Sequence, residues 1–142
     1  MRWDTRRLPA RVESLDAARR YVGDCADRVG LDPQRRFAVL LALEEAFVNV
    51  CGHAYPGTTG DVELACEHRE GAFVLEIGDT GVGFDVLTLP APDLSAGIEE
   101  RPLGGLGLHL IRSVARDVTY RRDGPRNILR MEFPPAASAD AG

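Results

Sequence analysis

A carboxylate and an amide stand four residues apart in a long apolar stretch, Leu40 to Tyr55 (LLALEEAFVNVCGHAY). Residues with this spacing stack on one face of an α-helix, so Glu45 and Asn49 would point into the same place. The other positions of that face are mostly small: Ala38, Leu41, Ala42 and Gly52. An amide oxygen is a suitable ligand for Mg²⁺, and a carboxylate can accept a proton from a nucleophile. The pair could therefore supply a metal ligand and a general base.

Glu44 is a second candidate base in this stretch. It would lie about 100° around the helix from Glu45, so only Glu45 shares a face with Asn49. A structural interpretation also stays open for the pair taken alone, because neighbouring backbone groups could satisfy both side chains. Without such partners, burial of each polar group would cost on the order of a few kcal/mol.

A second motif, Asp79-x-Gly81-x-Gly83, directly follows a predicted strand. A carboxylate held at a strand end can accept a hydrogen bond from an exocyclic amine such as that of adenine. The two glycines would let the backbone approach a planar ligand closely. An ordinary Asx or glycine turn is the alternative that this motif leaves open.

The third motif is Gly104-Gly105-Leu106-Gly107, which leads into a predicted helix at Leu108. Exposed amides and the dipole at a helix N-terminus attract anions, and glycines let phosphate oxygens reach those amides. A flexible hinge before the helix is the alternative. A Rossmann fingerprint is excluded, because this glycine run follows an irregular loop rather than a strand.

Composition narrows the function classes further. The net charge of −5 argues against a nucleic-acid-binding protein. All 17 basic residues are Arg, so no Lys is available for a P-loop or a Schiff base. No apolar run reaches the length of about 18 residues that spans a membrane, and the N-terminal segment has no apolar signal region. Three widely spaced cysteines, Cys25, Cys51 and Cys66, fit a reducing compartment, so we expect a cytoplasmic protein.

Two helices can be placed before the second motif. Ser14 is predicted to be the N-cap of the first, which ends near Gly30. Asp32 and Pro33 begin the second, with Asp as the cap and Pro at the first helical position, and it continues to about residue 52. The second helix carries Glu45 and Asn49 and is apolar almost all round, so we expect it to be central.

Strands are predicted around the remaining motifs. Alternating patterns predict one hairpin over residues 62–66 and 72–77, a second over 118–122 and 127–133, and a weak edge strand over 2–8. Residues 85–103 show little periodicity, and a loop of this length is usually a functional lid or binding loop.

The order of the three motifs resembles the ATP-binding domain shared by gyrase, MutL and histidine kinases. Within that superfamily, the chain is most similar to the anti-sigma factor serine/threonine kinases (RsbW-type) over roughly residues 10 to 133. The similar segments are Glu45-Ala46 through Asn49 to His53-Ala54-Tyr55, Gly-Gly-Leu-Gly-Leu-x-Leu-Ile, Asp117-Val118-x-Tyr120 and Asn127-x-Leu129. The last strand, 128–133, lacks the Thr that other branches use near adenine.

The resemblance and the predicted elements together imply an α/β two-layer sandwich of the Bergerat type. We expect a mixed, mostly antiparallel sheet with three main helices on one face. Residues 1–134 would form a single domain, and residues 135–142 a disordered tail.

The resemblance also implies a role for each motif. Asn49 would bind Mg²⁺ that bridges the phosphates, and Glu45 would be the catalytic base that acts on a Ser or Thr of a partner. Asp79 would bind adenine, with Gly81 and Gly83 shaping the base pocket. The ATP phosphates would be held by Gly104, Gly105, Leu106, Gly107 and Leu108, chiefly by Gly105 and Gly107. A solvated Arg101 is favoured over a γ-phosphate ligand, and a packing role for His53 is favoured over metal binding.

The function that follows is an ATP- and Mg²⁺-dependent protein kinase. Its substrate would be a small anti-sigma factor antagonist (STAS-type), and the kinase would also sequester a sigma factor, with the nucleotide state selecting the partner. The first helix and Leu31–Arg36 would contribute to the binding surface, and a homodimer is compatible with this scheme. Two alternatives stay open: an ATP-binding switch that transfers no phosphate, and the detached ATPase half of a histidine kinase.

Overall fold

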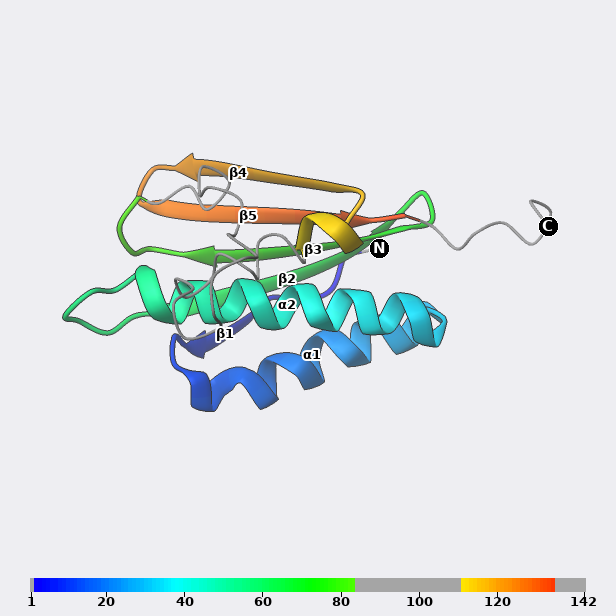
Figure 1. Ribbon diagram of the computed structural model, residues 1–142, viewed down its shortest axis with the longest axis horizontal. Helices are drawn as coiled ribbons and strands as arrows, with labels where there is room; N and C mark the ends of the chain where they lie inside the picture. The colour runs from blue at the N-terminus through cyan, green and yellow to red at the C-terminus, as the bar shows by residue number, and fades with distance from the viewer. Residues whose placement is uncertain (1, 84–110, 135–142) are drawn as a thin grey trace, which may run out of the picture.

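The computed structural model describes residues 2–83 and 111–134, which form one sheet with helices packed on it (Figure 1). In chain order the elements are β1 Arg6–Pro9, the 3₁₀ turn η1 Val12–Ser14, α1 Leu15–Arg28, α2 Pro33–His53, β2 Asp61–Arg69, β3 Ala72–Asp79, β4 Asp117–Asp123 and β5 Arg126–Phe133. Residues 111–114 are also helical.

The five strands lie in the order β1-β2-β3-β5-β4. All strand pairs among the described residues are antiparallel, so the mostly antiparallel sheet is confirmed and no parallel pair is found among them. The predicted edge strand is confirmed as β1, which occupies one end of the sheet. The two helices α1 and α2 run side by side over one face (Figure 1). This arrangement confirms the two-layer α/β sandwich.

The core lies between that face and α2. Alternate residues of β3 point towards the helices, and Phe73, Leu75 and Ile77 are almost completely buried. They belong to one apolar cluster with Val39, Leu43 and Phe47 of α2. Because β3 lies at the centre of the sheet, α2 covers the strand that ends at Asp79.

The ends of the helices show which local predictions hold. The Asp32 carboxylate accepts a hydrogen bond from the backbone N–H of Arg35 at 2.8 Å, so the predicted cap of α2 is confirmed. Ser14 stands at the predicted N-cap position of α1, but the predicted capping interaction is wrong, because its side chain makes no capping hydrogen bond. The η1 turn already holds Ser14 in a helical backbone conformation, whereas a capping Ser is usually extended. Gly30 follows α1 with φ at +70°, as expected for a terminating glycine.

The two hairpins set the register that builds the site. Asp79, the last residue of β3, lies opposite Val62 of β2 on one side and Asn127 of β5 on the other. Asn127 in turn lies opposite Arg122 of β4. Asp79, Asn127 and Arg122 therefore form one cross-strand row at the same end of the sheet.

Within residues 2–83 and 111–134, no helix is long and apolar enough to cross a membrane. The same residues contain no group of three or more His, Cys, Asp or Glu side chains arranged to hold a metal. None of the three cysteines forms a disulfide.

Candidate functional site

Asn49 is a buried polar residue of α2 whose side chain makes no hydrogen bond to the described residues. Its side chain belongs to a residue that is 3% exposed, and neither the amide nitrogen nor the amide oxygen has a hydrogen-bond partner among the described residues. A buried amide without a partner costs about 1–3 kcal/mol. Neighbouring backbone therefore does not satisfy Asn49, and the amide is free to bind a ligand such as a metal ion.

Glu45 lies one helical turn before Asn49 and is partly buried. Burial raises the pKa of the Glu45 carboxyl, and the negative charge of Glu44 raises it further. No cation pairs with Glu45 among the residues that the structure describes. Glu44, in contrast, accepts a hydrogen bond from Arg19 at 3.4 Å on the exposed side of α2. A carboxylate with a raised pKa is the better proton acceptor, so the surroundings favour Glu45 over Glu44 as a general base.

Asp79 is 9% exposed and has one of its oxygens fully occupied. Its Oδ1 accepts hydrogen bonds from the backbone N–H of Gly81 at 2.9 Å and from Nδ2 of Asn127 at 2.8 Å. The first bond is the Asx turn that the sequence left open as an alternative. The Oδ2 atom receives no hydrogen bond from the described residues, which leaves it available as an acceptor.

Asn127 was not predicted as a site residue. It is 5% exposed and shares the helix-facing side of β5 with Leu129, Met131 and Phe133. A polar residue on the otherwise apolar, core-facing side of the strand was the signal that could have indicated it, because such a residue needs a buried partner.

The glycines of the second motif have a structural reason that the sequence did not show. A Cβ atom at Gly81 would lie 2.0 Å from the carbonyl oxygen of Ala54, just beyond the end of α2. The backbone N–H of Val82 donates to that same oxygen at 2.8 Å. The close contact at Gly81 is therefore with the end of α2, and the predicted approach to a planar ligand stays a prediction. At Gly83 a Cβ would meet only the flexible end of Arg122, at 3.0 Å.

Tyr55 also holds the loop that follows β3, through hydrogen bonds of its hydroxyl group. Its hydroxyl donates to the carbonyl oxygen of Asp61 at 2.6 Å and accepts from the backbone N–H of Thr80 at 2.9 Å. Gly60 lies so close to the ring that a Cβ there would be 2.1 Å from it. The segment after α2 thus holds the loop of Asp79 beside the helix that carries Glu45 and Asn49. Asn49 lies about 7–8 Å along the helix axis from Ala54, where the loop docks.

Replacement of Gly81 by Ala tests this docking. The added Cβ overlaps backbone rather than a flexible side chain, so the loop or the end of α2 must move. We expect a loss of about 1–3 kcal/mol in the free energy of unfolding, measured by urea denaturation. Gly83→Ala is the matched control and should change stability far less, because the guanidinium of Arg122 can shift. Equal losses for both variants would contradict the docking.

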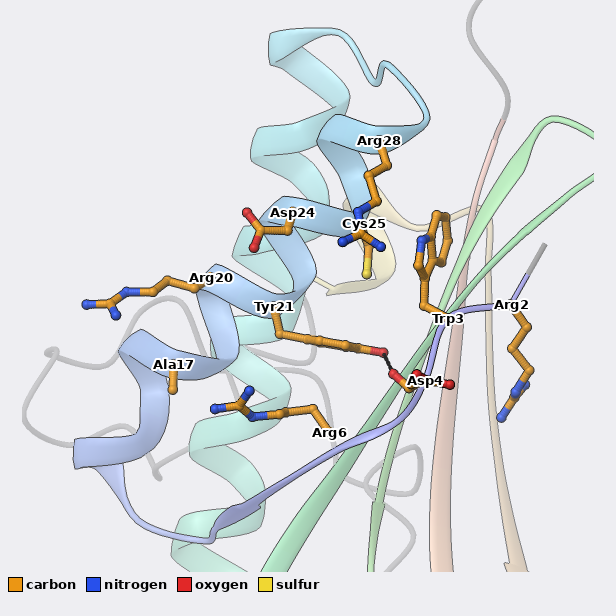
Figure 2. Close-up of a pocket in the computed structure, with 10 residues that line it drawn as sticks. All are labelled: Arg2, Trp3, Asp4, Arg6, Ala17, Arg20, Tyr21, Asp24, Cys25 and Arg28. Carbon is orange, nitrogen blue, oxygen red and sulfur yellow. Dashed lines mark hydrogen bonds between the residues drawn. The ribbon is translucent and has the colours of Figure 1, made fainter.

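A separate hollow lies between the N-terminal segment and α1 and contains none of the predicted site residues (Figure 2). The Tyr21 hydroxyl closes one side of it by donating to the Asp4 carbonyl oxygen at 2.7 Å. Two of its four arginines pair with carboxylates: Arg20 points away and pairs with Asp16, and Arg2 lies 3.8 Å from Glu67. We assign no site to this hollow.

The third motif lies outside the described residues. This applies to Gly104, Gly105, Leu106, Gly107 and Leu108, and to Arg101 and the rest of the predicted lid.

The chain is similar to a known family of domains and to named relatives. Residues 8–133 match the family described as histidine kinase-like ATPase domain. A serine-protein kinase RsbW of Bacillus mycoides (strain KBAB4) is 26% identical over 131 residues, which cover 89% of this chain and 82% of the relative. A protein of the same name from Bacillus cereus (strain AH820) is 27% identical over the same shares.

Solved structures support the fold. The blue-light activated histidine kinase of Erythrobacter litoralis EL346 superposes with a TM-score of 0.59 at 15% identity and covers 89% of this chain, which spans 43% of that protein. The histidine kinase AdeS of Acinetobacter baumannii gives a TM-score of 0.52 at 15% identity, over 94% of this chain and 70% of that one. With a family match over most of its length and structural neighbours of the same kind, the chain belongs to the histidine kinase-like ATPase family.

Proposed function

We propose that the protein is an ATP- and Mg²⁺-dependent serine/threonine kinase that phosphorylates an anti-sigma factor antagonist. The observation that carries this proposal is the buried amide of Asn49 one helical turn from the carboxylate of Glu45, since neither group has a partner among the described residues. The family and the names of the serine-protein kinase relatives support it.

In this proposal the adenine of ATP binds at Asp79, whose Oδ2 accepts a hydrogen bond from the exocyclic amine. Gly81 and Gly83 shape the pocket around the base. The phosphates would bind at Gly104, Gly105, Leu106, Gly107 and Leu108, where the sequence predicts the start of a helix whose amides would attract anions. The site thus extends from the end of the sheet to α2.

Asn49 fits the metal that this chemistry requires. Its Oδ1 is a hard oxygen donor, it is buried, and it has no competing partner among the described residues. Mg²⁺, when bound, neutralises the negative charge of the phosphates. Asn49 would hold the ion beside the phosphates.

Glu45 acts as the general base for transfer to the partner. It accepts the hydroxyl proton of a Ser or Thr as that oxygen bonds to the γ-phosphorus. The bond between the γ-phosphorus and the bridging oxygen breaks, and ADP leaves with the electron pair. The raised pKa of Glu45 suits this task, because a more basic carboxylate accepts the proton more readily.

The same protein would regulate transcription by binding partners. In the proposed scheme it sequesters a sigma factor in one nucleotide state and phosphorylates the antagonist, a small STAS-type protein, in another. The surface around Leu31–Arg36 supports protein binding, since Phe37 beside it is 69% exposed. A hollow at this residue is lined by apolar Leu31, Pro33, Leu40 and Leu41 and by charged Arg19, Asp27, Arg36 and Glu44.

Transfer of label from ATP tests the proposal. The protein is incubated with γ-labelled ATP and Mg²⁺ and with a candidate antagonist encoded by a neighbouring gene, and label on the antagonist is then counted. We expect Mg²⁺-dependent label that survives acid, as Ser and Thr phosphoesters do. Acid-labile label would indicate a phosphohistidine and the histidine-kinase alternative. ATP binding without transfer to any candidate would favour the switch that regulates by binding alone.

A further inference from the structure

We propose that Asn127 is a positioning residue that orients the Asp79 carboxylate towards the exocyclic amine of adenine. The inference rests on the proposed function, because it requires ATP to bind at Asp79. It adds a residue from β5, and its hydrogen-bonding partners from β4, to the part of the site that selects the base.

The first step is the fixed direction of the Asp79 carboxylate. Cross-strand register places Asn127 directly opposite Asp79, and Nδ2 donates to Oδ1 at 2.8 Å. The backbone N–H of Gly81 donates to the same oxygen at 2.9 Å. Rotation of the carboxylate would break both hydrogen bonds, so Oδ1 stays inside the network and Oδ2 is the acceptor left for a ligand.

The second step is the fixed orientation of the Asn127 amide. Nδ2 also donates to the carbonyl oxygen of Val82 at 2.8 Å. Oδ1 accepts from the hydroxyl of Tyr120 at 2.5 Å and from the guanidinium of Arg122 at 2.9 Å. With the amide reversed, its oxygen would face the Asp79 carboxylate and the Val82 carbonyl, and its NH₂ group would face the Arg122 donor. Only one orientation satisfies the network.

The third step is the consequence for the ligand. A buried donor beside Asp79 holds one carboxylate oxygen and leaves the other to accept a hydrogen bond from the ligand. The direction of Oδ2 is held by a relay from Tyr120 and Arg122 through Asn127, in addition to the Gly81 amide. Loss of Asn127 should therefore weaken the interaction with the exocyclic amine and leave contacts with the rest of the nucleotide in place.

The experiment compares ATP with purine riboside triphosphate, which lacks the exocyclic amine, by calorimetric titration in the presence of Mg²⁺. We expect the wild-type protein to prefer ATP by about tenfold or more, as for a hydrogen bond to a charged group. In Asn127→Ala most of this preference should disappear, through weaker ATP binding with little change for the purine analogue. Tyr120→Phe should reduce the preference less, because Arg122 still holds the amide.

Asn127→Asp is the rescue variant. At neutral pH it places two carboxylates side by side and should lose the preference for ATP. As the pH falls, the introduced carboxyl group becomes protonated and regains an O–H donor towards Asp79, so the preference should return in part. A residue needed only for stability would not show this pH dependence.

The outcomes separate the inference from the proposed function. If wild type binds neither triphosphate, the proposed function fails and the inference with it. If wild type binds both equally, ATP binding stands but the positioning of Asp79 is overturned. If Asn127→Ala remains folded by its thermal unfolding curve and weakens both ligands equally, Asn127 is structural and the inference is overturned.

Discussion

Asn49→Leu is expected to abolish Mg²⁺-dependent ATP binding and to stabilise the nucleotide-free protein. Leu branches at the same carbon as Asn but carries no polar atoms, so it removes a buried amide that has no partner among the described residues. That amide costs about 1–3 kcal/mol, and we expect a gain of that order in the free energy of unfolding. Denaturation of the nucleotide-free protein and titration with ATP, with and without Mg²⁺, measure the two effects.

Asn49→Asp is the matched variant. It keeps an oxygen ligand of the same reach but places a negative charge in a buried site, so it should be less stable than wild type without metal. Mg²⁺ should restore part of that stability by binding only the folded protein. Unchanged Mg²⁺-dependent ATP affinity in Asn49→Leu would show that the metal assignment is wrong. A destabilised Leu variant would show either that the amide has a partner or that Leu does not fit. Asn49→Ala, which is smaller, separates these two: it should also be destabilised if the amide has a partner, and less so if Leu is only too large.

The fold could be predicted wherever the signals are local. Asp32 and Pro33 predict the start of α2, because the capping hydrogen bond and the fixed φ of Pro act within one helical turn. The structure confirms this start, with α2 at Pro33–His53. Alternation within β2 and β3 predicted their hairpin for the same reason. Ser14 shows the limit, because the preceding 3₁₀ turn, which the sequence did not indicate, changes its backbone conformation and removes its capping role.

The residues of the candidate site differ in the same way, between those that local signals indicate and those that depend on tertiary contacts. Glu45 and Asn49 could be paired from the sequence because helical periodicity alone puts them on one face. The role of Asn127 depends on the register between β3 and β5, which are separated by a long stretch of chain, so spacing does not reveal its bond to Asp79. The close contact between Gly81 and Ala54 is likewise tertiary. The motifs thus predicted which residues could bind a ligand, whereas the residues that orient them required the packed structure.

Glu45→Gln is expected to lower the rate of phosphoryl transfer about 10²–10⁴-fold, with ATP affinity little changed, because the amide cannot accept the hydroxyl proton.

The same substitution should stabilise the protein at neutral pH. Burial raises the pKa of Glu45 above its unfolded value, so the native state holds the proton more strongly and stability falls as the pH rises through that interval. Gln removes this loss, and its advantage should vanish at low pH, where Glu45 is protonated in both states. Single-turnover transfer and unfolding curves at several pH values measure the two effects.

Glu44→Gln separates the base from its neighbour. Transfer requires ionised Glu45, so the rate should fall as the pH drops through the raised pKa of that carboxyl. The charge of Glu44 contributes to the raised value, and its removal should shift the acid limb of the rate profile to lower pH. Because Glu44 is exposed and paired with Arg19, the shift should be small and should shrink further as salt is added. A large loss of rate in Glu44→Gln with no shift of the limb would instead make Glu44 the base, whereas full transfer by Glu45→Gln would remove Glu45 from the chemistry.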